Sequence, residues 1–521
     1  DSFVISQEEF DYSGRLIPKA HEEIAFLMRN MAAVGIDLSF LPPLYHPVGR
    51  GILLSQGLTS AVKQLSSYYD DYNTPLCSGK PGFSIRLDHP DLPGLIDAFM
   101  AHEIVPRAEI TVRAREEDMK SEKGLEKVAD WIHKSADPVI AFEDNILRNS
   151  LPDSYLEEGF GNCSFVPLSS LPLSANECVH PLCLNLYSYV DRPFTSKARV
   201  NEGAFIEHIQ LAVRLADDFV DLEIHRIDQL LHSIVTDFKN REVRLREENI
   251  LRRIREKLFS GRRLSIGVTG YADMLAALGL SYGSEEALQI TEAVFQKLAV
   301  ESFRASAHLA NERGAFPAFR PEPERNYNYI NRLKELDPEL VDRMMADGRR
   351  NIAILAAGNC DDLTRMSGVS HKLQPILFPF FLRRKKLGSE NAQKGYDFID
   401  EDGTKWKNQF ELHPGFRHFL EAKGHAAQEI SAFSEKQLHG FYTGSPYYKA
   451  TCKDLGAREQ ILTLAKVQTW TDQNVRHTVT LKTKTTAGEI AEVIRSAHRY
   501  GVKTLYIYRE GFFMDTLHSE T

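Results

Sequence analysis

Hydrophobic and polar positions in the first 150 residues alternate between a helical and an extended period. Apolar residues recur at helical spacing over residues 17–33, and residues 36–41 then alternate as a strand does. The same succession continues, with helices predicted at 61–69, 95–102 and 124–135 and strands at 82–87, 108–112 and 139–142. Strands that alternate with helices favour parallel pairing with right-handed crossovers, in an open sheet or a barrel.

Helical periods dominate the middle of the chain. Apolar positions recur at helical spacing over residues 202–258 and 271–313, whereas residues 385–457 lack a clean period. A closing βαβ unit is predicted by a strand at 478–481, a helix at 487–500 and a strand at 504–508. We therefore expect one domain over residues 1–521, with a helical region at 202–313 and an irregular excursion at 385–457.

The composition narrows the class of protein. Hydrophobic residues make up 43% and charged residues 26% of the 521 positions, which is typical of a globular protein with a large core. The formal charge of −9, from 63 basic and 72 acidic residues, and the lack of a long basic run argue against a nucleic-acid partner. No apolar run approaches the ~18 residues of a membrane span, and residues 1–5 lack the features of a secretory signal. We expect a soluble, cytoplasmic protein that does not bind membranes.

The cysteines do not form a recognisable framework. There are six, at positions 77, 163, 178, 183, 360 and 452, which is few for so long a chain. Neither a Cys-x-x-Cys pair nor a familiar spacing of histidines marks a metal site. Any reactivity of these thiols must come from their local surroundings.

Several separated segments share the pattern of one family. In chain order they are 33–39, 86–91, 262–275, 312–317, 350–351 with 368–370, and 501–511. These segments resemble the large chain of ribonucleotide reductase, and the closing residues 506–509 are nearest its adenosylcobalamin-dependent class, class II. The resemblance implies an α/β fold, a ten-stranded α/β barrel with a central finger loop and helical additions. It also implies a radical-carrying cysteine at the tip of that loop and adenosylcobalamin as cofactor.

The loop at residues 161–168 falls where that family keeps its radical-carrying cysteine. The resemblance implies the pattern Asn-x-Cys-x-Glu, with the cysteine as a thiyl radical, the Glu as general base and the Asn as a substrate ligand. Cys163 keeps the sulfur, but Gly161 and Phe165 stand at the Asn and Glu positions, and Asn162 lies one residue from the expected place. Because a phenylalanine cannot accept a proton, the base is missing.

The two reducing cysteines implied by the resemblance match this chain poorly. Phe3 occupies the first position, on an early strand. The second should precede an Asn-Leu pair, which matches Asn185-Leu186; Cys178 lies one residue from the expected offset and Cys183 four residues beyond it. We keep Cys178 and Cys183 as alternative catalytic candidates beside Cys163.

A second segment offers a minor alternative for the finger loop. Residues 176–180 keep an Asn ahead of a cysteine and place His180 as a base. This interpretation requires the loop to move against both flanking segments, so residues 161–168 are preferred.

The phosphate site implied by the resemblance falls at residues 359–364. The ungapped match from 350 to 375 places four substrate-binding candidates there, namely Cys360, Asp361, Asp362 and Thr364. Two like charges within about 4 Å destabilise a partly buried site by several kcal/mol, so a nucleoside diphosphate is not the expected substrate. The carboxylates favour a cationic or neutral group or a divalent metal, unless they only cap a helix.

The sequence leaves three functions open. The first is an adenosylcobalamin-dependent radical enzyme that acts without net reduction on a cationic or neutral small molecule, because the base and the reducing thiols are missing together. The second is a degenerate, non-catalytic homologue kept for binding or assembly, and the third is ribonucleotide reductase itself. We expect the first, with a small-molecule substrate, without a nucleic-acid or membrane partner, and with a homodimer left open.

Overall fold

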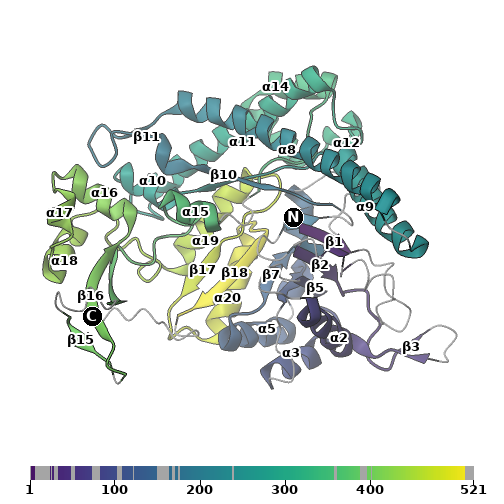
Figure 1. The fold of residues 1–521 in the computed structure, drawn as a ribbon, viewed down its shortest axis with the longest axis horizontal. Coiled ribbons are helices and arrows are strands. Elements are labelled where there is room, and N and C mark those ends of the chain that lie inside the picture. The colour runs from purple at the N-terminus through teal and green to yellow at the C-terminus, as the bar shows by residue number, and fades with distance from the viewer. Residues whose placement is uncertain are drawn as a thin grey trace.

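The computed structural model describes most of the chain (Figure 1). The described residues are 2–5, 24, 26–27, 33–48, 53–72, 82–101, 108–120, 122–149, 164–166, 171–173, 177–237, 240–356, 361–387, 396–400 and 402–510. Three predicted site residues, Asn162, Cys163 and Cys360, lie outside them, as does most of the helix predicted at 17–33.

Parallel strands form the first half of the fold. They are β1 (Ser2–Ile5), β2 (Ala33–Asp37), β5 (Gly82–Arg86), β6 (Glu109–Ala114) and β7 (Val139–Phe142). The helices between them in the chain are α2 (Gly57–Tyr72), α3 (Leu92–Met100), α4 (Glu116–Lys120) and α5 (Glu122–Ser135). The predicted alternation of strands and helices is therefore confirmed.

The closing βαβ unit joins this sheet. β17 (Thr478–Leu481), α20 (Ala487–Arg499) and β18 (Thr504–Arg509) form it, and its two strands are parallel, as predicted. β18 pairs with β7 in antiparallel direction, so the seven-stranded sheet has the order β1-β2-β5-β6-β7-β18-β17. In Figure 1 the yellow strands of the C-terminal unit accordingly lie beside β7.

A second group of strands extends this series. β10 (Pro181–Asn185) pairs in parallel with β13 (Ser265–Thr269), and Ile266 bridges to Leu355. The N–H of Gln473 donates to the carbonyl of Leu355 at 3.2 Å, which links the group to the segment before β17. The seven-stranded sheet, the Leu355 segment and the β13–β10 pair thus supply the ten strand positions of the expected barrel. Among the described residues, the end strands β1 and β10 are not paired with each other.

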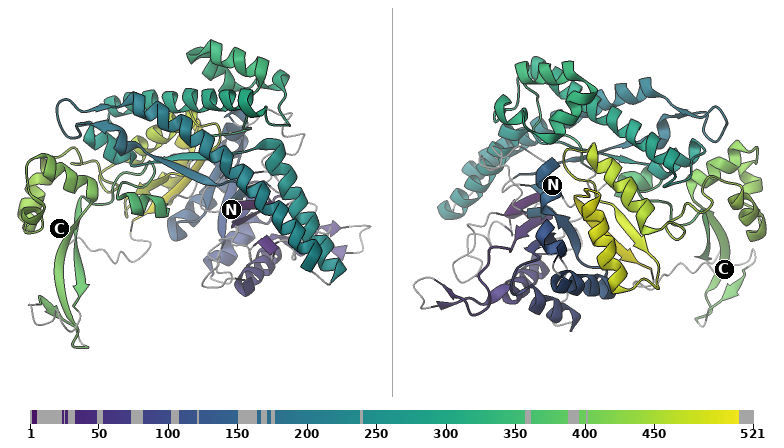
Figure 2. Two further views of the ribbon diagram at one scale, coloured as in Figure 1. Left: turned by 45° about the horizontal axis from the view of Figure 1, so that its top comes forward. Right: turned by 180° about the vertical axis from the view of Figure 1, so that it is seen from behind.

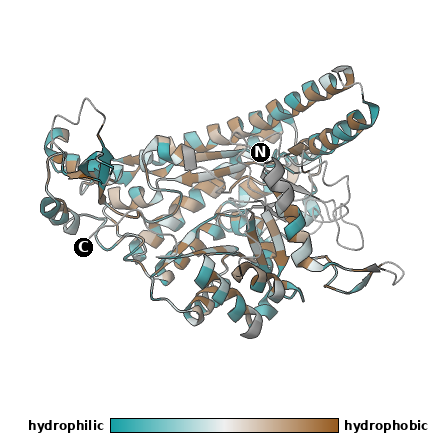
Figure 3. Cartoon of the chain, turned by 60° about the horizontal axis from the view of Figure 1, so that its bottom comes forward, coloured by the Kyte–Doolittle hydropathy of each residue, from teal (hydrophilic) through white to brown (hydrophobic). Residues whose placement is uncertain are grey.

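Helices cover one side of the second group. α8 (Glu202–Asp237) packs on β10, on β13 and on α11 (Glu285–Arg313), and α9 (Arg241–Gly261) runs beside α8 (Figure 2). Apolar and polar residues alternate along the helices, as Figure 3 shows, because their apolar side joins the core. Further helices are α6 (Glu143–Asn149), α10 (Tyr271–Ala277), α12 (Pro321–Glu324), α13 (Asn328–Leu336), α14 (Pro338–Asp347), α15 (Asp361–Ser367) and α19 (Ala457–Thr469).

A short hairpin follows the predicted finger position. Its strands are β8 (Ser164–Val166) and β9 (Leu171–Leu173), which pair in antiparallel direction. β8 contacts β1, β2 and β5. The backbone that directly follows position 163 therefore lies against three strands of the first half. Other short antiparallel pairs are β3 (Pro47–Val48) with β4 (Leu53–Leu54) and β11 (Val190–Asp191) with β12 (Arg199–Val200).

One predicted boundary is wrong. The strand predicted at 36–41 is β2 and ends at Asp37, because the Asp37 carboxylate accepts the N–H of Ser39 at 3.0 Å and turns the chain. The helical region predicted at 202–258 is confirmed and consists of two helices, because Asn240 starts α9 by accepting two backbone N–H groups of its first turn.

The excursion at 385–457 is more regular than predicted. β14 (Phe380–Lys386), β16 (Lys405–Leu412) and β15 (Phe398–Ile399) form an antiparallel sheet that projects from the body (Figure 1). The helices α16 (Pro414–Ala422), α17 (Ala427–Ile430) and α18 (Glu435–Thr443) follow it. The sheet escaped prediction because most of its positions are solvent-exposed, so apolar and polar residues have no reason to alternate.

A buried carboxylate joins the helices to the second group of strands. Asp217 on α8 is 0% exposed and accepts hydrogen bonds from Arg262 at 2.8 Å, Arg313 at 3.1 Å, Arg350 at 3.2 Å and Asn351 at 2.9 Å. Burial alone would raise the pKa of Asp217, but the hydrogen bond and charge of Arg262 and the charge of Arg350 outweigh it, so the pKa lies below its ordinary value. Asp217 thereby fixes the start of β13 and the segment that leads to Leu355.

We expect Asp217→Ala to lower the free energy of unfolding by about 3–5 kcal/mol, because it removes the buried one of the two carboxylates that pair with the buried Arg262 and leaves only Asp221, which is half-exposed. Chemical denaturation measures this loss. Asp228→Ala is the matched control, since Asp228 also lies on α8 and pairs with Arg255, but at the surface. Equal losses in the two variants would contradict the role of Asp217.

The same contact predicts a pH dependence. Since the folded pKa of Asp217 is depressed, its contribution to stability is present above its unfolded pKa and is lost as the pH falls through the folded pKa. Asp217→Asn should therefore flatten the acid limb of the stability curve.

Candidate functional site

The strands of the second group have a core side and an opposite, inner side. Ile266 and Val268 of β13 belong to the hydrophobic core beneath the helices. Because successive side chains of a strand point to opposite faces, Gly267 and Thr269 face the inner side. The same alternation applies to β10, where Leu184 belongs to the core.

Cys183 lies on the inner side. It is the register partner of Gly267 and directly precedes the core residue Leu184. Its burial is intermediate, and it is disulfide-bonded. The other described cysteines, Cys178 and Cys452, are free. The structure thus places one of the predicted cysteines on the inner face, in an oxidised pair.

Cys178 lies in a different environment. It is 2% exposed and belongs to the hydrophobic core. Burial, with a smaller contribution from Glu223, raises the pKa of its thiol far above the ordinary value. The preceding residue, Glu177, pairs with Arg263 at 2.8 Å. Cys178 is therefore a neutral thiol packed in the core and is not on the inner face with Cys183.

Polar groups gather where β10 and β13 end. The hydroxyl of Thr269 donates to the carbonyl of Ser370 at 3.0 Å and lies 2.8 Å from the hydroxyl of Thr364. Gly270 has φ +71°, and a Cβ there would meet the side-chain oxygen of Asn185 at 2.5 Å. Only a glycine lets the chain turn this close to β10. Of the predicted substrate-binding residues, Thr364 is thus brought to the carboxyl end of β13.

Asp361 and Asp362 are the first residues of α15, the helix that carries Thr364. They therefore start a helix whose Thr364 lies near the same strand end. An acidic helix start disfavours a phosphate group at that position. Of the other candidates, Asn162, Cys163 and Cys360 lie outside the described residues.

A buried Asp–His–Tyr cluster lies behind the strand ends and was not predicted. Asp273 on α10 is 0% exposed, and one of its oxygens accepts hydrogen bonds from His413 at 2.8 Å and Tyr447 at 2.7 Å. Its other oxygen accepts the N–H of Ser370 at 2.6 Å. Burial would raise the pKa of Asp273, but the charge and hydrogen bond of His413 and the bond from Tyr447 hold it below its ordinary value. The partners lie 140 and 174 positions away, so no local pattern marks the cluster.

Ion pairs occupy the inner side of the first half. Arg113 on β6 pairs with Asp37 at 2.5 Å and also with Glu143. At the start of the same strand, Glu109 pairs with Arg476 at 2.5 Å, and the guanidinium of Arg476 lies 4.4 Å from the ring centroid of Tyr506. The inner side is therefore polar on both halves of the fold, as a site for a polar substrate requires.

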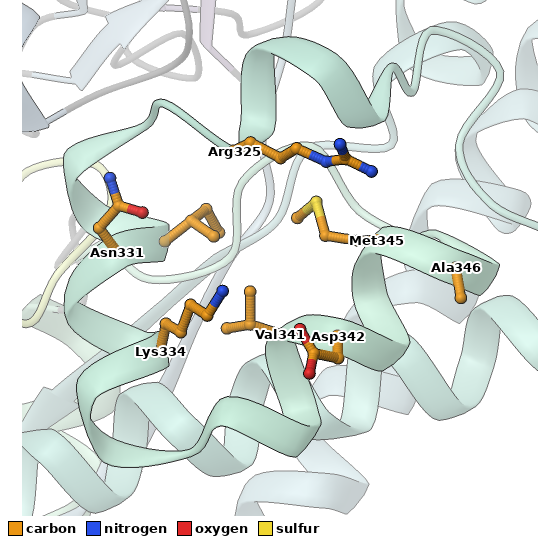
Figure 4. Close-up of a pocket in the computed structure, with 8 residues that line it drawn as sticks. Arg325, Asn331, Lys334, Val341, Asp342, Met345 and Ala346 are labelled. Atoms are coloured by element: carbon orange, nitrogen blue, oxygen red, sulfur yellow. The ribbon is translucent and has the colours of Figure 1, made fainter.

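Two hollows among the described residues lie on the helices, away from the inner side of the strands. Figure 4 shows one of about 510 Å³ beside α13 and α14, lined by Arg325, Lys334 and Asp342 among others. Another, of about 1020 Å³, lies between the start of α8 and α11. Neither is lined by a cysteine or a histidine, so we do not assign radical chemistry to them.

Two properties of the described residues bear on metals and membranes. No group of three or more His, Cys, Asp or Glu side chains there could hold a metal ion. None of the described helices is long and apolar enough to cross a membrane.

Comparisons with curated proteins point to one family. The chain is 24% identical over 433 residues to the vitamin B12-dependent ribonucleoside-diphosphate reductase of Mycobacterium tuberculosis (strain CDC 1551 / Oshkosh), covering 80% of this chain and 51% of that protein. It is 23% identical over 396 residues to the protein of the same name from Thermoplasma acidophilum, covering 75% and 43%. The chain thus spans about half the length of the curated relatives it matches.

The fold and the family agree. The structure matches the Actinobacillus ureae class Id ribonucleotide reductase alpha subunit with a TM-score of 0.62 and 16% identity, over 98% of this chain and 83% of that one. The family model described as "Ribonucleotide reductase, barrel domain" matches residues 181–508. Since that match covers more than half of the chain, this protein belongs to the family of the ribonucleotide reductase large chain.

Proposed function

We propose that this chain is the catalytic barrel of a cobalamin-dependent radical enzyme that reduces a ribonucleotide. The names of its relatives, vitamin B12-dependent ribonucleoside-diphosphate reductases, support the cofactor and the substrate class. The polar inner side of the barrel strands supports a site there. The observation that carries the proposal is the position of Cys183.

Cys183 changes the expectation drawn from the sequence. The sequence favours a reaction without net reduction, because Phe3 stands at the first reducing position, neither Cys178 nor Cys183 aligns cleanly with the second, and the base is missing as well. In the structure, Cys183 lies on the inner face opposite Gly267 and belongs to a disulfide. Two cysteines that pair on the inner face can give two electrons to a substrate as thiols and become a disulfide, so such a pair favours net reduction.

The proposed reaction balances with this pair. The carbon–oxygen bond at the ribose 2′ position breaks, and the hydroxyl leaves as water. Two thiols, of which Cys183 is one, supply two electrons and two protons and become a disulfide. Cys163 remains the proposed carrier of the radical, on the resemblance of its loop alone.

The chain and the cofactor would contribute different parts of the proposed reaction. Adenosylcobalamin would bring its own cobalt, so the chain would supply the cofactor's position and surroundings. When bound, adenosylcobalamin supplies the unpaired electron that a cysteine sulfur then holds. The chain itself contributes the inner-face sulfur of Cys183 and the polar end of β13 at Thr269.

A second candidate function is a radical reaction that proceeds without net reduction of the substrate. Two observations favour it, the acidic start of α15 at Asp361 and Asp362 and the absence of a carboxylate at Phe165. A substrate without a diphosphate, acted on without net reduction, would suit both. A non-catalytic homologue is the third outcome that the tests below distinguish.

We expect the native protein, with adenosylcobalamin, a dithiol and ribonucleotides, to form deoxynucleotide over repeated turnovers, and Cys183→Ala to lose this activity because one electron donor is gone. Chromatography of the nucleotides measures it. Cys178→Ala is the matched control: removing a core thiol lowers stability by about 0.5–3 kcal/mol but leaves turnover per folded molecule unchanged.

The other outcomes separate the alternatives. Loss of turnover in Cys178→Ala with full activity in Cys183→Ala would overturn the assignment of Cys183. Release of tritium from labelled adenosylcobalamin into water, dependent on Cys163 but without deoxynucleotide, would favour the reaction without net reduction. Absence of both product and tritium release would favour the non-catalytic homologue.

We expect the double substitution Asp361→Ser with Asp362→Ser to strengthen the binding of a nucleoside diphosphate by on the order of tenfold or more, because it removes two like charges from the start of α15. Titration calorimetry measures the affinity. Asp342→Ser with Asp347→Ser makes the same charge change on exposed positions of α14 and should leave it unaltered. An unchanged affinity in both variants would show that α15 does not face the substrate's phosphates.

A further inference from the structure

The side of α8 that faces away from the core carries a line of leucines. Val213 and Val220 of this helix belong to the hydrophobic core. Leu211, Leu215 and Leu222 are instead 55%, 47% and 62% exposed. At about 100° per residue, these leucines fall within about 40° of one another around the helix and opposite the two valines. They form one apolar line over about three turns, called the leucine line below.

The spacing of the leucine line is that of a helix–helix contact. Single exposed leucines are ordinary on a protein surface. Leu211, Leu215 and Leu222, however, follow one another at four and seven residues, as do the apolar positions along which two helices pack. A solvated helix face normally carries polar residues at such positions. The remaining position of the line is Asp218, whose carboxylate pairs with Arg313 at 2.7 Å, so it would not enter an interface as an unpaired charge.

The neighbouring helix leaves the leucine line open. α8 and α9 run side by side and extend from the body (Figure 2). Asp221 pairs at 2.7 Å with Arg262, which follows α9 directly. Asp228 pairs at 2.6 Å with Arg255 of α9. Both aspartates lie roughly 100–120° around α8 from the leucine line, so α9 packs on another side of the helix. A further helix can therefore lie along the leucine line without displacing α9.

Exposed charges of opposite sign lie at the two ends of the leucine line. Glu207 stands four residues before Leu211, and Arg226 stands four residues after Leu222. Both charged side chains are exposed. The charge of Arg226 acts on His180, but within the described part of the chain neither Glu207 nor Arg226 forms an ion pair with a side chain of opposite charge. The leucine line thus has an acidic end and a basic end.

We propose that the leucine line is an interface between two copies of this chain, whose α8 helices pack in antiparallel direction. When Leu211 of one copy lies opposite Leu222 of the other, Glu207 comes to the level of Arg226, because each charge lies four residues outside its leucine. Twofold symmetry repeats both contacts, and the two Leu215 side chains lie on either side of the axis. The leucine line is therefore complementary to itself in spacing and in charge.

The charges decide the direction of the two helices. A parallel pair would bring Glu207 of one copy to Glu207 of the other, and Arg226 to Arg226, and like charges at such distances repel. The antiparallel pair places opposite charges at both ends of the contact instead. Opposite charges at the rim of an interface fix its register, while the leucines supply the apolar area.

The test is sedimentation velocity of the full chain over a range of concentrations. We expect a native dimer that dissociates on dilution. Leu211→Glu with Leu222→Glu should weaken the dimer by on the order of a hundredfold or more, because carboxylates then face one another where leucines met. Leu54→Glu with Leu377→Glu makes the same change at positions outside α8 that are 56% and 59% exposed, and should leave the dimer unaltered. Thermal unfolding checks that both variants remain folded.

A second pair of variants tests the antiparallel direction. Glu207→Arg alone and Arg226→Glu alone should each weaken the dimer, because each places like charges at both ends of the contact. An equal mixture of the two variants should regain the native affinity, because the mixed dimer has opposite charges at both ends. A mixture as weak as either variant would overturn the antiparallel interface. So would a native chain that stays monomeric at every concentration, or equal losses in the Leu211/Leu222 and Leu54/Leu377 variants. This proposal does not depend on the reaction proposed above.

Discussion

The buried carboxylate of Asp217 is the constraint on which the second half of the fold depends. It accepts hydrogen bonds from Arg262, which lies just before β13, and from Arg350, which lies just before the Leu355 segment. These contacts hold α8, β13 and the Leu355 segment in one arrangement. A charge at 0% exposure is tolerated only where its partners compensate the lost hydration, and here they come from different segments of the chain. The register of β13 with β10 therefore rests on an electrostatic contact outside the sheet.

That register decides which cysteine reaches the inner face. With Leu184 held in the core, its neighbour Cys183 must point the other way, opposite Gly267. Cys178 lies in the core instead, where its thiol stays neutral. The alternation along β10 thus places the sulfur of Cys183 on the inner face, whereas the segment before β10 buries the thiol of Cys178 in the core.

The polar end of β13 and the β14–β16 sheet are joined through His413. This residue follows β16 directly and donates to Asp273, whose carboxylate also holds Ser370 beside Thr269. The excursion is therefore anchored on the same buried carboxylate that supports the strand ends. The β14–β16 sheet and the carboxyl end of β13 are therefore both held by hydrogen bonds to Asp273.

The sequence by itself determined the alternation of strands and helices, the closing βαβ unit and the family, because periodicity and short motifs are local properties. It named Cys183 and Thr364 as candidates but could not choose between Cys183 and Cys178, because the face of a strand residue depends on what the neighbouring residue packs against. It missed the cluster of Asp273, whose partners are distant in the chain, and the β14–β16 sheet, whose exposed strands carry no apolar period. Only the tertiary structure could decide these features, because burial and charge proximity arise when separated segments meet.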